Sequence, residues 1–282
     1  MIEYIIIAIL QGLIESLPIS SSGQVMIISM EFFDIPPQDA FSLAIFLHLG
    51  TIIAILLKFY QEFLNMIKSF IPQKFDVEEI DIKNRNWLIF AAIGTAVVAV
   101  PVYFLFKVHV IEEFTALSGD LITLIISGLL IITGIILLNI KKKYGIKQIG
   151  SMEQNEITKD SFLAGLFQGF SVLSGISRSG ITVSSILLND YKEDNALKLS
   201  FLMSVPAVLG SIGIEILFNE QSIVGSLDIF LLLSLTLISA IFGYISIDLL
   251  LKLAKKMKFT YFCIIYGMFP FAVIVPFMLG TT

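Results

Sequence analysis

Arg178 is the one cationic side chain inside the apolar segments of this chain of 282 residues. An arginine in the middle of a lipid bilayer costs about 2.5–3.5 kcal/mol on insertion scales, so it normally faces a polar cavity or a counter-charge. Its planar guanidinium group matches the oxygens of a phosphate. Two interpretations are open: a structural ion pair with Glu15, or a phosphate clamp that also contacts Glu15.

Glu15 is the second residue in an apolar segment whose side chain could take part in chemistry. Gln11 precedes it by four residues, so on a helix the two side chains share one face, just before Pro18. The carboxylate has four open roles: structural partner, proton relay, general base or metal ligand. With the amide oxygen of Gln11 it would bind a divalent cation, Mg²⁺ or Ca²⁺, that also bridges a diphosphate.

Both charged residues belong to serine-rich motifs that resemble each other. Gln11–Gly23 reads QGLIESLPISSSG and Gln168–Gly180 reads QGFSVLSGISRSG, with six of thirteen positions identical. This similarity predicts an internal duplication. In each motif a serine-rich turn leads into a short helix, whose free N–H groups and positive dipole end suit an anion.

The composition places these motifs in a membrane. Hydrophobic residues make up 56% of the chain and charged residues only 15%, against about 25% in soluble domains. A spanning helix needs about 20 apolar residues. Six segments meet this length: 41–59, 87–106, 119–140, 199–218, 228–251 and 259–280.

Two further apolar segments, 2–33 and 161–189, are interrupted by Pro, Gly and Ser, which leaves halves too short to cross. Each is typical of a re-entrant helix pair. We therefore predict an all-α integral membrane protein with six transmembrane helices and two re-entrant pairs. It forms a single domain over 1–282, with repeat halves of approximately 1–140 and 141–282.

The basic residues set the orientation. Sixteen of the 18 Lys and Arg lie in four connections, which are 59–86 together with Lys58, 141–160, 190–198 and 252–258. If these connections are cytoplasmic, both termini are external and the two pairs enter from opposite sides, as in an inverted repeat. The expected partner is the lipid bilayer. No basic patch supports nucleic-acid binding, and a monomer and a homodimer both remain open.

The motifs resemble those of the undecaprenyl-diphosphate phosphatase family, also called bacitracin-resistance proteins. That family carries Glu/Gln-x-x-x-Glu leading into Leu-Pro-x-Ser-Ser-x-Gly, and Pro-Gly-x-Ser-Arg-Ser-x-x-Thr; here they stand at Gln11–Gly23 and Ser174–Thr182. The resemblance implies a metal-dependent hydrolase of the plasma membrane that removes the terminal phosphate of a polyprenyl diphosphate. It makes Glu15, Ser21 and Arg178 the candidate catalytic residues. The candidate substrate-binding residues are Gln11, Ser20, Ser22, Gln24, Gln168, Ser177, Ser179 and Thr182.

Gln24 departs from the family motif, which usually has His at this position as a candidate nucleophile or proton carrier. Ser21 or a metal-bound water would then attack the phosphorus, while Glu15 holds the metal or takes the proton. His48 either lines this site or is a packed histidine bonded to a backbone carbonyl. The alternative function is a transporter or flippase of a phosphorylated polyprenyl lipid, since broken helices in an inverted repeat also suit alternating access.

Overall fold

The computed structural model describes residues 1–16, 20–106, 145–218 and 227–253, with scattered residues between 124 and 135 and residue 268. Within this part of the chain every regular element is helical, and the one β contact is an isolated bridge between Lys147 and Tyr191. The predicted helical class is therefore confirmed for the described residues.

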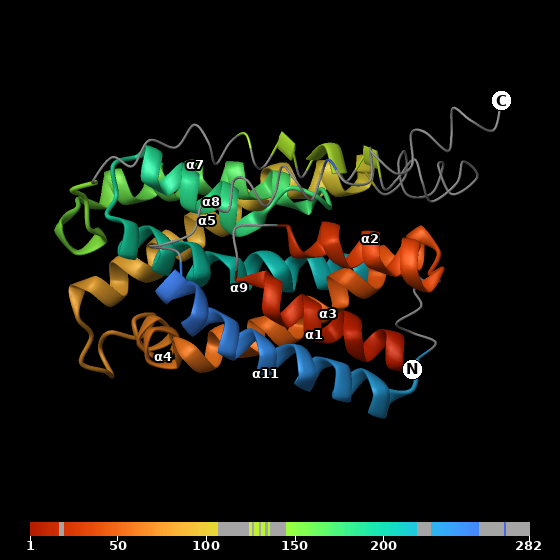
Figure 1. The fold of residues 1–282 in the computed structure, drawn as a ribbon. Coiled ribbons are helices and arrows are strands. Elements are labelled where there is room, and N and C mark those ends of the chain that lie inside the picture. Colours follow the sequence, from red (N-terminus) through yellow and green to blue (C-terminus); the bar gives the residue numbers. More distant parts are fainter. Residues whose placement is uncertain are drawn as a thin grey trace.

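Four long helices run side by side and form the frame of the molecule (Figure 1). They are α3 (Pro37–Lys58), α5 (Glu79–Phe106), α9 (Glu193–Phe218) and α11 (Ile229–Leu253). All four are long and apolar enough to cross a membrane, and they contain the predicted spans 41–59, 87–106, 199–218 and 228–251 almost completely. The other two predicted spans, 119–140 and 259–280, lie outside the described residues apart from isolated positions.

The outward surface of these helices is apolar, as lipid contact requires. Ile93 and Val97 on α5 and Leu233 and Leu237 on α11 are exposed large side chains at helical spacing. In water such exposure would be unfavourable, whereas acyl chains cover it without cost.

Two pairs of shorter helices pack against this frame. The first is α1 (Ile2–Glu15) with α2 (Ser21–Phe33); the second is α7 (Gln154–Gly169) and α8 (Arg178–Leu188), joined through the 3₁₀ turn η4 (Phe170–Val172). With 14 residues, α1 is about 21 Å long, well short of the roughly 30 Å of a hydrocarbon core. The helix α7 begins at Gln154, before the expected start at 161, because residues 154–160, which are polar apart from the buried Ile157, continue the helix beyond its apolar part.

The aligned serines begin the second helix of each pair in the same way. The Ser20 hydroxyl accepts a hydrogen bond from the Gly23 amide at 3.3 Å, and the Ser177 hydroxyl accepts one from the Gly180 amide at 3.1 Å. Their backbone angles also agree: φ −65° and ψ 104° at Ser20, φ −69° and ψ 116° at Ser177. These are N-caps, and their equivalence supports the predicted duplication.

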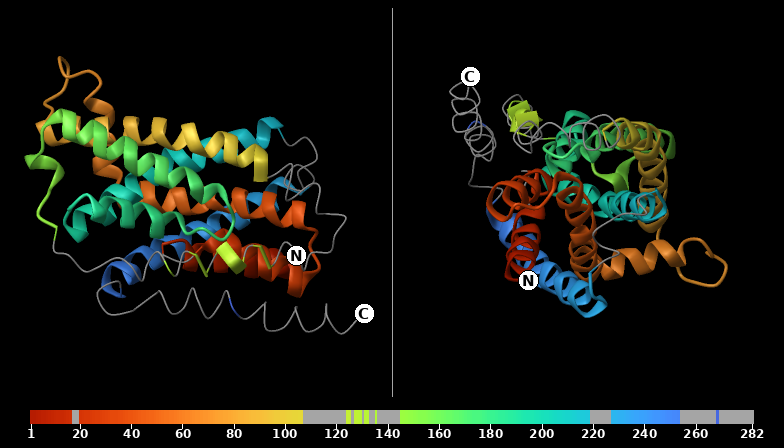
Figure 2. Two further views of the ribbon diagram at one scale, coloured as in Figure 1. Left: turned by 90° about the horizontal axis from the view of Figure 1, so that it is seen from above. Right: turned by 90° about the vertical axis from the view of Figure 1, so that its right-hand side faces the viewer.

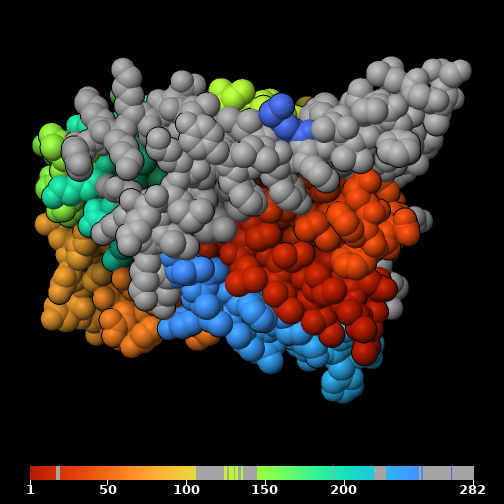
Figure 3. All heavy atoms as spheres, in the orientation of Figure 1, coloured from red at the N-terminus to blue at the C-terminus, as the bar shows by residue number. Residues whose placement is uncertain are grey.

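The glycine after each aligned glutamine lets its helix approach a long neighbour. A Cβ atom at Gly12 would lie 2.6 Å from the Ser239 carbonyl oxygen on α11, and one at Gly169 would lie 2.5 Å from Val98 Cβ on α5. Small residues permit such close helix contacts in membranes. The contact of α1 with α11 is visible on the face shown in Figure 3, where the red and blue surfaces meet.

Two short elements complete the described part. The helix α4 (Tyr60–Lys68) connects α3 to α5, and the 3₁₀ turn η3 (Ile149–Ser151) precedes α7. In the right-hand view of Figure 2, which looks along the long helices, α4 is seen from the side and projects from the bundle.

Candidate active site

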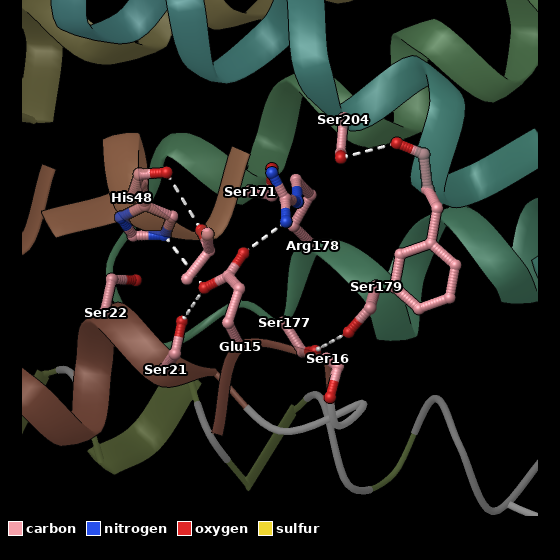
Figure 4. A network of polar contacts seen from close by, with 12 residues as sticks. Glu15, Ser16, Ser21, Ser22, His48, Ser171, Ser177, Arg178, Ser179 and Ser204 are labelled. Atoms are coloured by element: carbon pink, nitrogen blue, oxygen red, sulfur yellow. Dashed lines mark hydrogen bonds and ion pairs between the residues drawn. The ribbon is translucent and has the colours of Figure 1, made fainter. Parts of the chain in front are cut away.

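The ends of the two helix pairs meet in the interior of the bundle (Figure 4). Glu15 is the last residue of α1, Ser21 is the first of α2, and Arg178 is the first of α8. They border a cavity of about 80 Å³. Its polar wall also includes Ser20, Ser22, Thr95, Gln168, Ser171, Ser174, Ser177, Ser179 and Ser211.

The Glu15 carboxylate is the centre of the site. Arg178 donates from Nη2 to Oε1, and Ser21 donates from Oγ to Oε2. The Gln11 amide donates to Oε2 at 2.8 Å, and His48 Nε2 lies 3.1 Å from the same oxygen. Since the Glu15 side chain is only 6% exposed, these contacts take the place of water around its charge.

The Arg178 guanidinium is only partly used by Glu15. Its side chain is 14% exposed and lines the cavity. Nε and Nη1 are buried and have no hydrogen-bond partner among the described residues. A buried donor without an acceptor is costly, and phosphate oxygens are well suited to fill that role. The ion pair expected under the first interpretation is therefore present, together with the spare donors that the phosphate clamp requires.

His48 both lines the site and bonds to a backbone carbonyl, the two alternatives that the sequence left open. Nδ1 lies 2.5 Å from the Ala44 carbonyl oxygen, one turn earlier on α3. Because a carbonyl oxygen and a carboxylate oxygen both only accept, these contacts assign one proton to Nδ1 and a second one to Nε2, which donates to Glu15. The other ring nitrogen faces Glu15, and the ring borders the cavity.

Ser20 joins the two motifs directly. Besides capping α2, its hydroxyl accepts a hydrogen bond from the Gly175 amide at 3.0 Å. The turn before Arg178 is thereby fixed to the turn before Ser21. The remaining aligned serines, Ser22, Ser177 and Ser179, line the cavity beside them.

Three predicted substrate-binding residues, Gln11, Gln24 and Thr182, do not line the cavity. Gln11 is fully buried behind Glu15, and Gln24 is buried on α2 with an Nε2 atom that lacks a partner among the described residues. Thr182 donates to the Arg178 carbonyl oxygen at 2.6 Å and contacts Ser200 at the same distance. In this structure Gln11 and Thr182 contact other residues of the site, Glu15 and Arg178.

The long helices add lining residues that the motifs do not contain. Thr95 comes from α5 and Ser211 from α9. Hydroxyl side chains are common in apolar helices, so the sequence offered no signal that distinguishes these two. Apolar residues of the cavity lining include Phe41 and Ile45 on α3 and Ala207 and Val208 on α9.

The ligand atoms available at the site limit the kind of metal ion that it could bind. No cluster of three or more His, Cys, Asp or Glu suited to a metal occurs in the described part of the chain. Glu15 is the one carboxylate of the cavity lining, and Gln11 Oε1 is a buried oxygen without a described partner. One carboxylate and one amide oxygen fit a hard cation that takes its other ligands from phosphate and water, as Mg²⁺ commonly does.

Known proteins include clear relatives of this chain. The family model described as "Bacitracin resistance protein BacA" matches residues 4–272. This chain belongs to the BacA family. Its relatives include the "Undecaprenyl-diphosphatase" of Methanothrix thermoacetophila, which is 36% identical over 272 residues and 96% of both chains. The protein of the same name from Methanococcoides burtonii is 35% identical over 94% of this chain and 95% of its own length.

Membership of the BacA family confirms the resemblance first drawn from the two motifs. Together with the four apolar helices, it identifies the chain as a multi-pass membrane protein. The match also extends well beyond the motifs, since it includes the segments between and around them.

Proposed function

We propose that this protein is an undecaprenyl- or polyprenyl-diphosphate phosphatase. It would hydrolyse the terminal phosphate of the lipid carrier diphosphate and release the monophosphate lipid and inorganic phosphate. The observation that carries the proposal is the buried Arg178 guanidinium, which keeps two donors without described partners beside Glu15 and Ser21. The names of the relatives favour hydrolysis over the transport alternative.

The geometry supports separate roles for Ser21 and Glu15 in phosphoryl transfer. Ser21 Oγ, or a water in its place, forms a bond to the terminal phosphorus, and the bond from that phosphorus to the bridging oxygen breaks. Ser21 donates to Glu15 Oε2, so the carboxylate receives the nucleophile's proton. Any phosphate left on Ser21 is then released by water.

Arg178 stabilises the charge on the transferring phosphate. Positioned donors aimed at developing negative charge are a main source of catalysis in such reactions. The N-termini of α2 and α8 lie at the same place, and the positive end of a helix dipole favours an anion. The apolar wall that contains Phe41 and Ile45 suits the first isoprene units of the lipid.

Glu15 and the Gln11 amide oxygen would hold a divalent cation, Mg²⁺ or Ca²⁺, which when bound neutralises charge on the diphosphate. The present Gln11 orientation points Nε2 toward Glu15. Rotating this amide by 180° would place Oε1 where Nε2 now lies. Which of the two atoms faces Glu15 depends on the hydrogen-bond partners that are present.

The proposal includes the full topology of six spans and two re-entrant pairs in an inverted repeat. The equivalent caps at Ser20 and Ser177 and the equivalent packing glycines, Gly12 and Gly169, support the repeat. With the basic connections cytoplasmic, both termini are external. The plasma membrane is the proposed location, where a lipid carrier is used.

The test is phosphate release from a long-chain polyprenyl diphosphate by purified protein in detergent, with and without divalent metal. We expect release by the wild type and strong losses in Glu15→Ala, Ser21→Ala and Arg178→Ala. Ser234→Ala is the matched control, because Ser234 is an exposed residue of α11 that bonds only within its own helix. No release by the wild type, or activity untouched by all three changes, would refute the proposal.

A further inference from the structure

The helix α4 carries an apolar surface that no described part of the chain covers. Five large residues in and just after it are between 46% and 64% exposed. We call this set the outer stripe: Tyr60, Leu64, Ile67, Phe70 and Ile71. Tyr60, Leu64 and Ile67 follow one another at intervals of four and three, which places them on one face of α4, and Phe70 and Ile71 extend the apolar surface into the turn that follows the helix.

The opposite face of α4 is firmly attached to the bundle. Met66 is buried, and Phe63 packs with Phe59 against the core between α3 and α9. Glu62 forms an ion pair with Lys198 of α9 at 2.9 Å. Arg85 donates to the Ser69 carbonyl oxygen at 2.6 Å, where the helix ends. The outer stripe therefore belongs to a fixed helix with two apolar faces, of which only one is packed on protein.

The position of α4 identifies what covers the outer stripe. The helix begins two residues after the last residue of α3, Lys58, and lies across the direction of the long helices (Figure 2). Ile53 and Leu57 near the end of α3 are exposed apolar residues, so the exposed apolar surface of this span reaches the beginning of α4. The outer stripe is thus continuous with the lipid-facing surface of a membrane span.

We propose that α4 lies in the interface of the bilayer, with the outer stripe inserted among the acyl chains. Amphipathic helices that run along a membrane surface bind in this way. Two exposed polar residues, Gln61 and Lys68, flank the stripe on one side of the helix, where Gln61 donates to the Tyr60 hydroxyl at 2.9 Å; in the proposed arrangement this polar edge faces the water. This inference is independent of the proposed enzymatic function.

The interaction is apolar in character and needs no anionic lipid. The exposed Lys68 and Lys74 are followed by the carboxylates of Asp76 and Glu78, so the segment has little net positive charge to attract acidic headgroups. The helix should occupy the same depth in a neutral phosphatidylcholine bilayer as in one that contains an anionic lipid.

Spin labelling tests the proposal on the full chain. The single cysteine, Cys263, is replaced by Ser, and single cysteines at positions 67, 64 and 61 carry a nitroxide. Collision rates with oxygen, which concentrates in lipid, and with a water-soluble nickel chelate are measured in phosphatidylcholine nanodiscs. Gln61→Cys is the matched control on the water side of the same helix.

We expect the oxygen-to-nickel ratio to be several-fold higher for Ile67→Cys and Leu64→Cys than for Gln61→Cys, with no change when anionic lipid is added. Similar, nickel-accessible labels at all three positions would overturn the proposal. Dipolar coupling between labels of two chains at position 67 would also overturn it, since a second copy would then cover the stripe. Thermal unfolding in detergent verifies that each labelled variant is folded.

Discussion

The coupling of Glu15 and Arg178 gives the most direct test of the site. Removing one member of a buried ion pair costs about 3–5 kcal/mol, because the other charge is left buried without compensation. Both side chains are largely buried, at 6% and 14% exposure. In Glu15→Gln the guanidinium loses its carboxylate, so we expect the full cost. At roughly 2–4 °C per kcal/mol for a chain of this size, the melting temperature should fall by about 6–20 °C.

Arg178→Gln and the double variant determine how much of this destabilisation comes from the interaction between the two charges. Arg178→Gln leaves Glu15 beside His48, 3.1 Å away, so its loss should be smaller. The double variant removes both charges and should recover about 0.5–3 kcal/mol relative to the sum of the single losses, the range of coupling energies for residues in contact. Glu62→Gln is the control, because the Glu62–Lys198 pair is more exposed and such pairs contribute about 1 kcal/mol or less.

Thermal unfolding in detergent, followed by the fluorescence of Trp87, measures these changes. This single tryptophan is buried and contacts the Tyr191 ring edge-on. Pyrophosphate is then added to each variant. A ligand stabilises the form that binds it, and the guanidinium freed in Glu15→Gln should gain more from the anion than the wild type does. Additive losses in the double variant, or no stabilisation of Glu15→Gln by pyrophosphate, would refute the clamp.

Four further outcomes are expected. Ser21→Ala should abolish phosphate release, and acid-quenched wild type should yield a phosphopeptide that contains Ser21; a missing phosphopeptide with activity retained would favour water as the nucleophile. His48→Phe should lower kcat roughly ten- to a hundredfold, since a hydrogen bond to a charged group contributes about 1.5–3 kcal/mol, whereas His48→Gln, which can still donate to Glu15, should lose less. Equal losses in the two His48 variants would contradict a positioning role. Gln24→His should leave KM unchanged, because Gln24 does not line the cavity, and a rise in KM would place it at the substrate. Chelation with EDTA should stop phosphate release, and added Mg²⁺ or Ca²⁺ should restore it; full activity in EDTA would exclude the Glu15–Gln11 cation site.

The sequence predicted the elements that depend on local patterns. Apolar length identified the four described spans, and the aligned motifs located the breaks at which Ser20 and Ser177 cap the following helices. The beginning of α7 could not be predicted from such a pattern. Six of the seven residues 154–160 are polar, and a hydropathy pattern cannot show that a helix continues past the apolar region.

Contacts between distant segments could be predicted only where charge required them. A buried Arg178 needs a counter-charge, and Glu15 was the evident partner. Thr95 and Ser211 needed no partner, so their place at the cavity depends on helix rotation, which the sequence does not reveal. Gln11 and Gln168 are aligned in the two motifs, yet Gln168 lines the cavity and Gln11 lies behind Glu15. The sequence could not predict this difference, because aligned residues share a local conformation but have different neighbours.

The separation of Glu15 and Arg178 by 163 residues has a consequence for biosynthesis. Chains are synthesised from the N-terminus, so α1 and α2 enter the membrane long before α8 exists. During that interval the carboxylate lacks its guanidinium, and Ser20 lacks the Gly175 amide that it later binds. The first helix pair therefore completes its burial only when the second arrives, which makes the closing of the site a late step in the maturation of the whole chain.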